Sequence, residues 1–228
     1  MSRPPWAIMS MGHHVAIVLF IDVTAACTTF VVGRGATADG SVLASHSNDG
    51  DGVTAGNLKL IRASDWKLPA RTHGDVPQVA HTHAYFTKAG GYASMNEFQV
   101  GLAESTCVAA FTANRSAGAR LNIVDLGALG LERASNARAA VQVMGGLAER
   151  FGYADNGESL LVYDPGEAFI FHVLPDDTGA SAVWVAQRVP DDHVAVVANA
   201  FTVRQVAFDD PHAFLTSSNM RALPGRPN

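Results

Sequence analysis

Residues 26–49 read Ala-Cys-Thr-Thr-Phe-Val-Val-Gly-Arg-Gly-Ala-Thr-Ala-Asp-Gly-Ser-Val-Leu-Ala-Ser-His-Ser-Asn-Asp. The β-branched and aromatic residues at 28–33 are typical of a strand, and the Asp39-Gly40 pair that follows is typical of a turn. Residues 42–45 then provide a return strand. The stretch therefore predicts a β-hairpin whose first strand begins directly after a cysteine.

The predicted hairpin brings this cysteine and several polar side chains to one end of a sheet. Two strands of similar length joined by a turn place residues 46–49, which include Asp49, beside Cys27. An ionised thiol is a strong nucleophile. Acyl transfer also needs a carboxylate to hold an amine and donors to stabilise an oxyanion. We therefore predict an acyl-transfer site at Cys27, with a structural cysteine as the alternative.

The segment before Cys27 has features of a targeting signal. Its apolar stretch, residues 15–21, is too short to span a bilayer as a helix. It follows Arg3 and precedes small residues at 24–26, as in a secretory signal, although Asp22 is unusual in such a region. A first buried strand and a stretch ahead of the true start are the alternatives. Cleavage after the small residues would make the cysteine a chain end.

A cysteine at the chain end carries its own candidate base. The α-amino group has an ordinary pKa of about 7.7–8.0, so it is partly neutral at pH 7. It can take the thiol proton directly or through a water molecule. Before cleavage the same nitrogen belongs to an amide and cannot act as a base. Removal of residues 1–26 is therefore predicted to switch the enzyme on.

The middle of the chain predicts strands and one helix. Residues 65–90 are polar and are interpreted as an excursion over the surface. Residues 96–103 resemble a strand, and a turn is predicted at 104–106. Residues 134–151 have apolar side chains at helical spacing and end before Gly152, which predicts a helix.

The last third predicts a series of short strands separated by turn-forming residues. These strands are expected at Ser159–Tyr163, Ala168–Leu174, Ala182–Val189 and His193–Phe201. Short strands at this spacing predict an antiparallel meander. Together with the helix, they predict the α+β class.

Composition limits the partners of this chain. Its 228 residues suffice for one sizeable core, and a formal charge of −5 without a block of Lys or Arg argues against nucleic acid and anionic membranes as partners. His73, His81 and His83 are irregularly spaced without a clear cysteine or carboxylate companion, so we expect no metal site. Cys107 is expected to be a small buried hydrophobe, with a bridge to Cys27 left open.

Several blocks of the sequence resemble the dipeptidase A and secernin family of the N-terminal nucleophile hydrolases. The blocks are residues 26–33 with 36–41 and 48–49, residues 95–106, residues 164–169, and residues 184–192 with Asn199. The Cys-Thr-Thr start is short, but its combination with Trp-Val-Ala-Gln-Arg-Val-Pro-Asp-Asp at 184–192 is highly specific. The resemblance covers roughly residues 26–220.

This resemblance implies a fold, an activity and a set of site residues. The fold would be a four-layer αββα sandwich, in which two antiparallel sheets pack face to face with helices outside. The activity would be hydrolysis of dipeptides by a cysteine-type exopeptidase, without a metal or organic cofactor. Cys27 corresponds to the N-terminal nucleophile and Asp49 to the acidic residue that supports the amine. Asn96 and Asn199 fall in blocks that supply oxyanion and substrate contacts.

His46 and Glu104 are the expected substrate-binding residues. Many family members have Arg where His46 stands, so a titratable imidazole replaces a fixed charge here. Glu104 is interpreted either as a buried hydrogen-bond hub or as an anchor for the substrate amine. Trp184 is expected in the core, and Arg188 is expected to form an ion pair at a turn.

Members of the resembled family are generally about twice this length. We therefore expect residues 27–228 to form a hydrolase domain that is incomplete at its C-terminus, preceded by a removable segment, residues 1–26. The expected location is secreted or vacuolar/lysosomal, with the cytoplasm as the alternative, and a homo-oligomer is left open. An acylase of the same fold that acts on a non-peptide amide is the alternative function. An inactive fragment or binding protein is a third.

Overall fold

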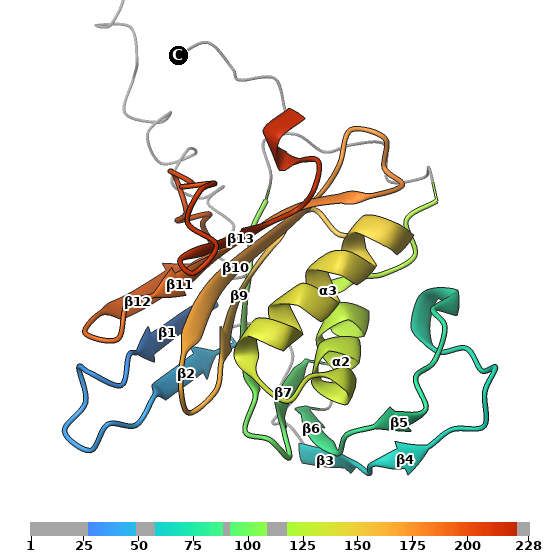
Figure 1. Cartoon of the computed structure of the whole chain (residues 1–228), viewed down its shortest axis with the longest axis horizontal. Coiled ribbons are helices and arrows are strands. Elements are labelled where there is room, and N and C mark those ends of the chain that lie inside the picture. The colour runs from blue at the N-terminus through green and yellow to red at the C-terminus, as the bar shows by residue number, and fades with distance from the viewer. Residues whose placement is uncertain (1–26, 49–57, 89–91, 109–117, 223–228) are drawn as a thin grey trace, which may run out of the picture.

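The computed structural model describes residues 27–48, 58–88, 92–108 and 118–222 (Figure 1). The helices are α2 (Ile123–Arg133) and α3 (Ala137–Phe151), with 3₁₀ turns η2 (His73–Asp75) and η3 (Met220–Ala222). The strands are β1 (Thr28–Val32), β2 (Leu43–Ser47), β3 (Leu58–Ile61), β4 (Ser64–Asp65), β5 (His81–Thr82), β6 (Tyr85–Lys88), β7 (Ala93–Asn96), β8 (Gly101–Thr106), β9 (Glu158–Tyr163), β10 (Ala168–Pro175), β11 (Ala182–Val189), β12 (Val194–Ala198) and β13 (Phe214–Thr216). Neither α2 nor α3 is long and apolar enough to cross a membrane.

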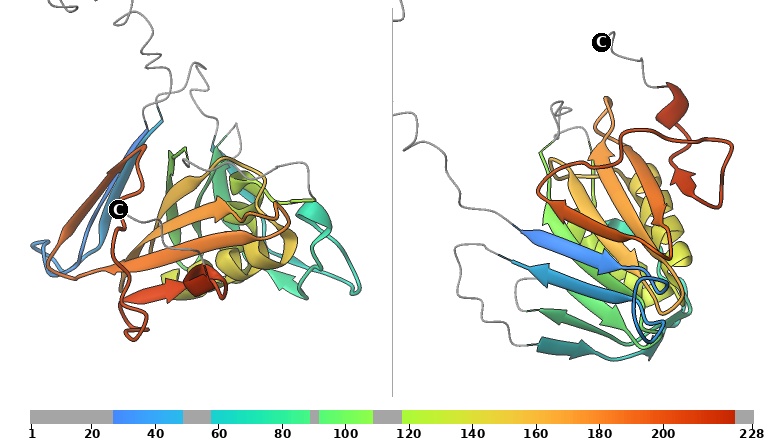
Figure 2. Two further views of the ribbon diagram at one scale, coloured as in Figure 1. Left: turned by 90° about the horizontal axis from the view of Figure 1, so that it is seen from above. Right: turned by 90° about the vertical axis from the view of Figure 1, so that its left-hand side faces the viewer.

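The described residues form three layers, two of which are sheets. The large sheet has the strand order β13-β11-β10-β9-β8-β7-β6-β3, and the small sheet has the order β12-β1-β2. Figure 2 shows the small sheet standing over one face of the large sheet, while α2 and α3 cover the opposite face. The mixture of antiparallel sheets and helices confirms the α+β class.

Each interface between layers has its own apolar core. The larger core fills the space between the helices and the large sheet, where Leu129, Met144, Phe169 and Phe171 are completely buried. The second core lies between the two sheets and is built from six smaller buried side chains: Val31, Ala103, Leu161, Ala168, Val189 and Val197. The large sheet is therefore apolar on both faces, which explains the continuous burial along β9 and β10.

Helix α3 was predicted and helix α2 was missed. Asn136 caps the N-terminus of α3 by accepting from the Ala139 amide, so this helix begins a turn later than predicted. Helix α2 contains two glycines, which have low helix propensity. One of them, Gly130, packs so closely on α3 that a Cβ there would lie 2.8 Å from Met144 Cγ. The capping box of Asn122 and Asp125 was the sequence signal for this helix.

Two predictions for the middle of the chain were wrong. Residues 104–106, predicted as a turn, form the end of β8, and the hairpin turn lies earlier, between Asn96 and Gly101. Gln99 has a left-handed φ of 62° in this turn. The predicted surface excursion at 65–90 was wrong for its last part only, because residues 65–81 are mostly exposed whereas Tyr85–Lys88 form β6 of the large sheet. Pairing with β9 outweighed the polar character of residues 104–106.

The predicted meander holds for three strands and then breaks. Strands β9, β10 and β11 pair in sequence, but β12 leaves the large sheet and pairs with β1 in the small one. The crossing loop is held by backbone hydrogen bonds from Gly33 N to His193 O at 2.9 Å and from Gly35 N to Asp191 O at 2.7 Å. A Cβ at Gly33 would lie 2.4 Å from Asp191 O, so this close approach requires glycine.

A charge network supports the same crossing loop. Asp191 accepts from Arg34 at 2.8 Å and from Arg188 at 2.5 Å, and Arg188 also pairs with Glu167 at 3.1 Å. The prediction of an ion pair at Arg188 is therefore confirmed, and Trp184 is buried as expected.

His172 ties the segment after β12 to the large sheet. The amides of Thr202 and Val203 donate to His172 Nε2 at 3.0 and 3.1 Å, and the Phe201 ring packs edge-on against the imidazole. Burial lowers the pKa of His172 to about 4. The neutral ring therefore accepts both hydrogen bonds and fixes the chain just beyond Asn199.

His172 should make the fold sensitive to acid. Because the folded pKa lies below the ordinary value of about 6.5, the unfolded chain binds this proton first, and stability falls as pH falls from about 6.5 to about 4. We expect the His172→Gln variant to lose less stability than the wild type between pH 7 and pH 5, by on the order of 1–2 kcal/mol in denaturant titrations. The exposed His81→Gln variant is the control, and equal acid sensitivity in all three proteins would contradict the assignment.

Candidate active site

Cys27 lies at one end of the small sheet, immediately before its central strand β1. Thr28 pairs with Ser47 of β2 and with Ala198 of β12. The Thr28 amide also donates to Ser47 Oγ at 3.1 Å. The predicted hairpin is confirmed, and it places the buried cysteine between the ends of two neighbouring strands.

Strand β8 of the large sheet supports Cys27 from the other layer. Ser105 Oγ donates to the Cys27 carbonyl at 3.3 Å and accepts from the Asn199 amide at 2.8 Å. Asn199 Nδ2 donates to Thr106 O at 2.7 Å. Asn199 has a φ of 49°, a left-handed conformation that Asn tolerates better than most residues. The structure thus brings Asn199, selected from the sequence, next to Cys27.

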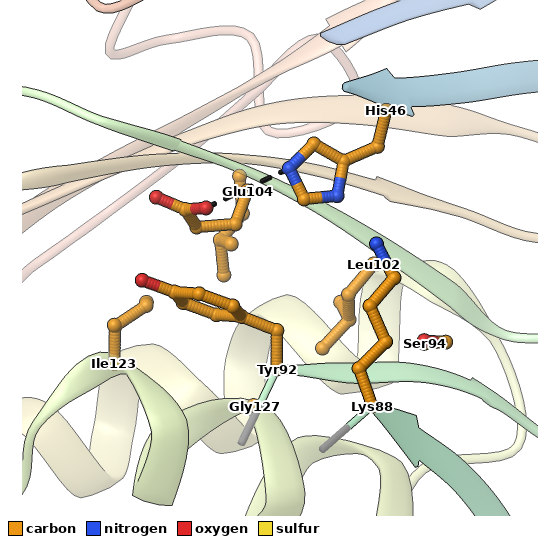
Figure 3. Close-up of a pocket in the computed structure, with 9 residues that line it drawn as sticks. His46, Lys88, Tyr92, Ser94, Leu102, Glu104, Ile123 and Gly127 are labelled. Atoms are coloured by element: carbon orange, nitrogen blue, oxygen red, sulfur yellow. Dashed lines mark ion pairs between the residues drawn. The ribbon is translucent and has the colours of Figure 1, made fainter. Parts of the chain in front are cut away.

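His46 and Glu104 complete the immediate surroundings of Cys27. Their ligand-type atoms and that of Cys27 lie within 4.8 Å of one another. His46 Nε2 is 3.6 Å from Glu104 Oε2, and only 3% of the Glu104 side chain is exposed (Figure 3). Thr106 Oγ1 donates to Glu104 Oε1 at 2.6 Å. Both residues selected as substrate contacts are therefore beside the candidate nucleophile.

The carboxyl group of Glu104 is held ionised. Burial acts to raise its pKa, but the interactions with His46, Glu158 and Thr106 outweigh burial and leave the pKa below its ordinary value. A buried negative charge therefore stands close to the thiol. Such a charge disfavours a second anion nearby and favours a cation.

Glu158 is a functional candidate that the sequence analysis did not find. It pairs with Thr106 across β8 and β9 and is almost fully buried. Burial, and then the neighbouring Glu104 carboxylate, raise the pKa of Glu158 to about 10. The two carboxyl groups therefore share one negative charge at neutral pH. A perturbed pair of this kind is typical of functional sites.

Tyr92 stands between two recesses beside this pair of carboxyl groups. One recess is lined by His46, Lys88 and Glu104, the other by Thr106 and Glu158, and Tyr92 and Ile123 line both. Burial, and then the charges of Glu104, Glu158 and Cys27, raise the pKa of Tyr92 to about 12. Its hydroxyl therefore keeps its proton and can act as a hydrogen-bond donor.

Asn96 does not lie in this cluster. Its Nδ2 donates to Leu131 O at 2.9 Å and Ala134 O at 2.7 Å, and its Oδ1 accepts from the Phe98 and Val100 amides at 3.0 Å. Both N–H groups are therefore engaged at the C-terminal end of α2. Asn96 lies opposite Val100. That position is about 16 Å along the strand from Ser105, at roughly 3.3 Å per residue. The structure assigns it a supporting role in the fold.

Asp49 and the segment before Cys27 lie outside the described residues. Asn48, the last described residue of this stretch, directly follows β2. Cys107 is buried as expected, and it is not joined to Cys27 by a disulfide in the described structure. Burial is the main cause that raises the pKa of the Cys107 thiol to about 12, so this thiol is a poor nucleophile.

The predicted absence of carboxylate companions for the histidines was wrong. His73 lies 3.3 Å from Asp125, and His81 lies 2.7 Å from Asp65. These partners were hidden because folding brings them from other segments. The ligand-type atoms of His81, His83 and Glu97 lie within 4.8 Å of one another, so this group and the Cys27 group could each hold a metal ion. The absence of a metal site stays a prediction.

A family model and several known relatives of this chain agree on one peptidase family. The model of Peptidase family C69 matches residues 26–224. A probable dipeptidase of Latilactobacillus sakei is 24% identical over 221 residues, and dipeptidase A of Lactobacillus helveticus is 26% identical over 220 residues. These alignments cover 86% of this chain and 44% and 45% of the two relatives. The chain thus spans under half of the length of the curated relatives it matches.

The raised pKa of Glu158 should appear in the pH dependence of stability. Because the folded chain holds this proton up to about pH 10 and the unfolded chain loses it near 4.5, wild-type stability falls as pH rises between these values. We expect Glu158→Gln to remove this loss and to gain stability relative to the wild type between pH 5 and pH 8. The gain is on the order of 1 kcal/mol or more by denaturant titration. The half-exposed Glu97→Gln should show no such gain. An unchanged pH slope in Glu158→Gln would contradict a protonated Glu158.

Proposed function

Because the chain belongs to peptidase family C69, we propose that it is a cysteine-type dipeptidase with Cys27 as its nucleophile. The observation that carries this proposal is the position of Cys27 at a sheet end, within 4.8 Å of the ligand-type atoms of His46 and Glu104. This arrangement combines a nucleophile with charged groups that can orient a polar substrate. Cys107 is not part of this group, and burial raises the pKa of its thiol to about 12.

In the proposed mechanism, removal of residues 1–26 turns the amide of Cys27 into an α-amine. We propose that this segment is an export signal or propeptide, so that activation accompanies secretion or delivery to a vacuole. The amine takes the thiol proton, and the sulfur attacks the scissile carbonyl carbon to form a tetrahedral intermediate. The C–N bond breaks as the leaving amine receives the proton. Water then hydrolyses the thioester and restores the thiol.

Asn199 is proposed to stabilise the oxyanion of the tetrahedral intermediate. Its Nδ2 uses one N–H on the Thr106 carbonyl and keeps a second N–H for the substrate. The Ser105 hydroxyl holds both the Asn199 amide and the Cys27 carbonyl, so donor and nucleophile share one support. Loss of such a donor costs about 3–4 kcal/mol in the barrier. Asp49, one residue beyond Asn48, is proposed to hold the α-amine.

The proposed domain, residues 27–228, corresponds to part of a four-layer αββα sandwich. The exposed apolar side chains on the outer face of the small sheet favour a further helical layer over that face. Phe30, Leu43, Val194 and Val196 are each at least 39% exposed. In the described residues, no helix covers this face (Figure 2). An apolar surface of this kind is typical of a face that another element covers.

The proposed nucleophile can be tested with a matched pair of cysteine variants. N-terminal sequencing of the purified active protein should give Cys27 as the first residue. Cys27→Ala should lower kcat/KM for dipeptides by at least ~10³-fold, since the covalent route is removed. Cys107→Ala, at the other buried cysteine, should keep activity within a few-fold of the wild type.

The same assay distinguishes dipeptidase from acylase activity. Dipeptides should be hydrolysed, and acyl amides such as a conjugated bile acid should not. Full activity of Cys27→Ala would disprove the proposed nucleophile. Preference for acyl amides over dipeptides would favour an acylase.

A further inference from the structure

The two recesses beside Tyr92 differ in the ionisable side chains that line them. The first contains His46, Lys88 and Glu104, and Figure 3 shows the Lys88 side chain extending toward the His46 ring. The second contains Asp155 and Glu158 and has no Lys, Arg or His among its lining residues. Both recesses share the wall formed by Tyr92 and Ile123, so they lie side by side.

The acidic recess has a buried acceptor atom that lacks a partner. Glu158 is 2% exposed, and its Oε1 makes no hydrogen bond within the described part of the chain. Asp155 is engaged differently, because its Oδ2 accepts from the Ile123 amide at the start of α2 at 2.7 Å. Glu158 is therefore the lining carboxyl that can take a hydrogen-bond donor from a ligand.

The acidic recess is suited to an ammonium group. Thr106 lines it and donates to Glu104, which connects the recess to the carboxylate beside Cys27. A cation beside Glu104 and Glu158 can hydrogen-bond to both carboxyl groups, and its charge favours the ionised form of each. The N-terminus of α2 carries a partial positive charge that would repel an ammonium group. This repulsion is small, because Asn122 and Asp155 accept hydrogen bonds from the first amides of the helix.

The first recess is suited to a carboxylate at Lys88. Lys88 makes no ion pair with any carboxylate in the described ranges, although it lines the same recess as the charged Glu104. Its compact ammonium group on a flexible stem can reach a ligand oxygen. His46 lies between the Lys88 side chain and Glu104, as Figure 3 shows.

We propose that the two recesses bind the two charged ends of one dipeptide, with the α-ammonium group in the acidic recess at Glu158, next to Glu104, and the α-carboxylate at Lys88. This inference rests on the proposed function and deepens it. A dipeptide spans at most about 7 Å, so both of its charged ends lie close to the scissile bond. The Cys27 thiol, within 4.8 Å of the ligand-type atoms of His46 and Glu104, stands where that bond would lie.

This arrangement would make both charged ends part of substrate selection. A residue added at the amino end would replace the ammonium with an uncharged amide in a recess lined by acids. A residue added at the carboxyl end would remove the anion that faces Lys88. A site built for a charged group rejects an analogue that lacks it, because its own buried polar groups are then left unpaired.

Three substrates and three variants test this inference. The substrates are Ala-Ala, N-acetyl-Ala-Ala and Ala-Ala amide, which remove one terminal charge at a time. The variants are Glu158→Gln, Lys88→Gln and, as a matched control, Lys59→Gln on the exposed neighbouring strand β3. We expect the wild type to prefer Ala-Ala over each blocked peptide by about 10²-fold or more in kcat/KM.

Each variant should relax selection at one end only. Glu158→Gln should reduce the discrimination against N-acetyl-Ala-Ala by about 10-fold and leave that against Ala-Ala amide unchanged. Lys88→Gln should show the opposite pattern, and Lys59→Gln should match the wild type. Misfolding would weaken all three reactions together and leave the ratios unchanged. Unchanged ratios in both Glu158→Gln and Lys88→Gln, with hydrolysis intact, would overturn the inference.

Calorimetry separates this inference from the proposed function. Cys27→Ala should bind Ala-Ala without hydrolysing it, and adding Glu158→Gln or Lys88→Gln should weaken the selectivity for the corresponding end. If the wild type hydrolyses no dipeptide but these binding ratios change as stated, the dipeptidase proposal fails and the charge assignment stands. If Cys27→Ala binds Ala-Ala no better than its two blocked forms, the charge assignment fails.

Discussion

Pairing of β1 on both of its edges is the constraint on which the candidate site depends. The strand is held by β2 on one side and β12 on the other, and its buried face packs on the large sheet through Val31. These contacts leave Cys27 little freedom in register or orientation. Every other group at the site is positioned relative to this strand end, including His46 from β2 and Asn199 just beyond β12.

Two carboxyl groups are buried beneath this strand end, which costs folding free energy that packing alone does not offset. An ionised carboxylate in an apolar environment is unfavourable unless it is paired. Glu104 remains ionised through its neighbours, and Glu158 remains protonated because it is buried and because Glu104 is close to it. A purely structural pair could be replaced by apolar residues at little cost. Its presence next to a thiol is explained if a cationic ligand completes the pair.

The sequence predicted the elements whose signals are local. The hairpin around Asp39-Gly40, the strands of residues 159–189 and the helix before Gly152 all depend on periodicity and turn chemistry, and the structure has them. Long-range choices were missed, such as the transfer of β12 to the other sheet. The role of Glu158 was also hidden, because its pKa depends on a neighbour across the sheet. Asn96 resembled a site residue by its motif, but its hydrogen-bond partners come from α2.

The pairing of β1 with β12 also sets the order in which parts of the chain can fold. Thr28 pairs with Ala198, so the contact that secures the cysteine joins positions separated by most of the described chain. Contacts of such long sequence separation form slowly, and during synthesis the later partner emerges from the ribosome last. Strand β1 must therefore wait for β12. Until β12 has been synthesised, the strand pairing that fixes the position of Cys27 is incomplete.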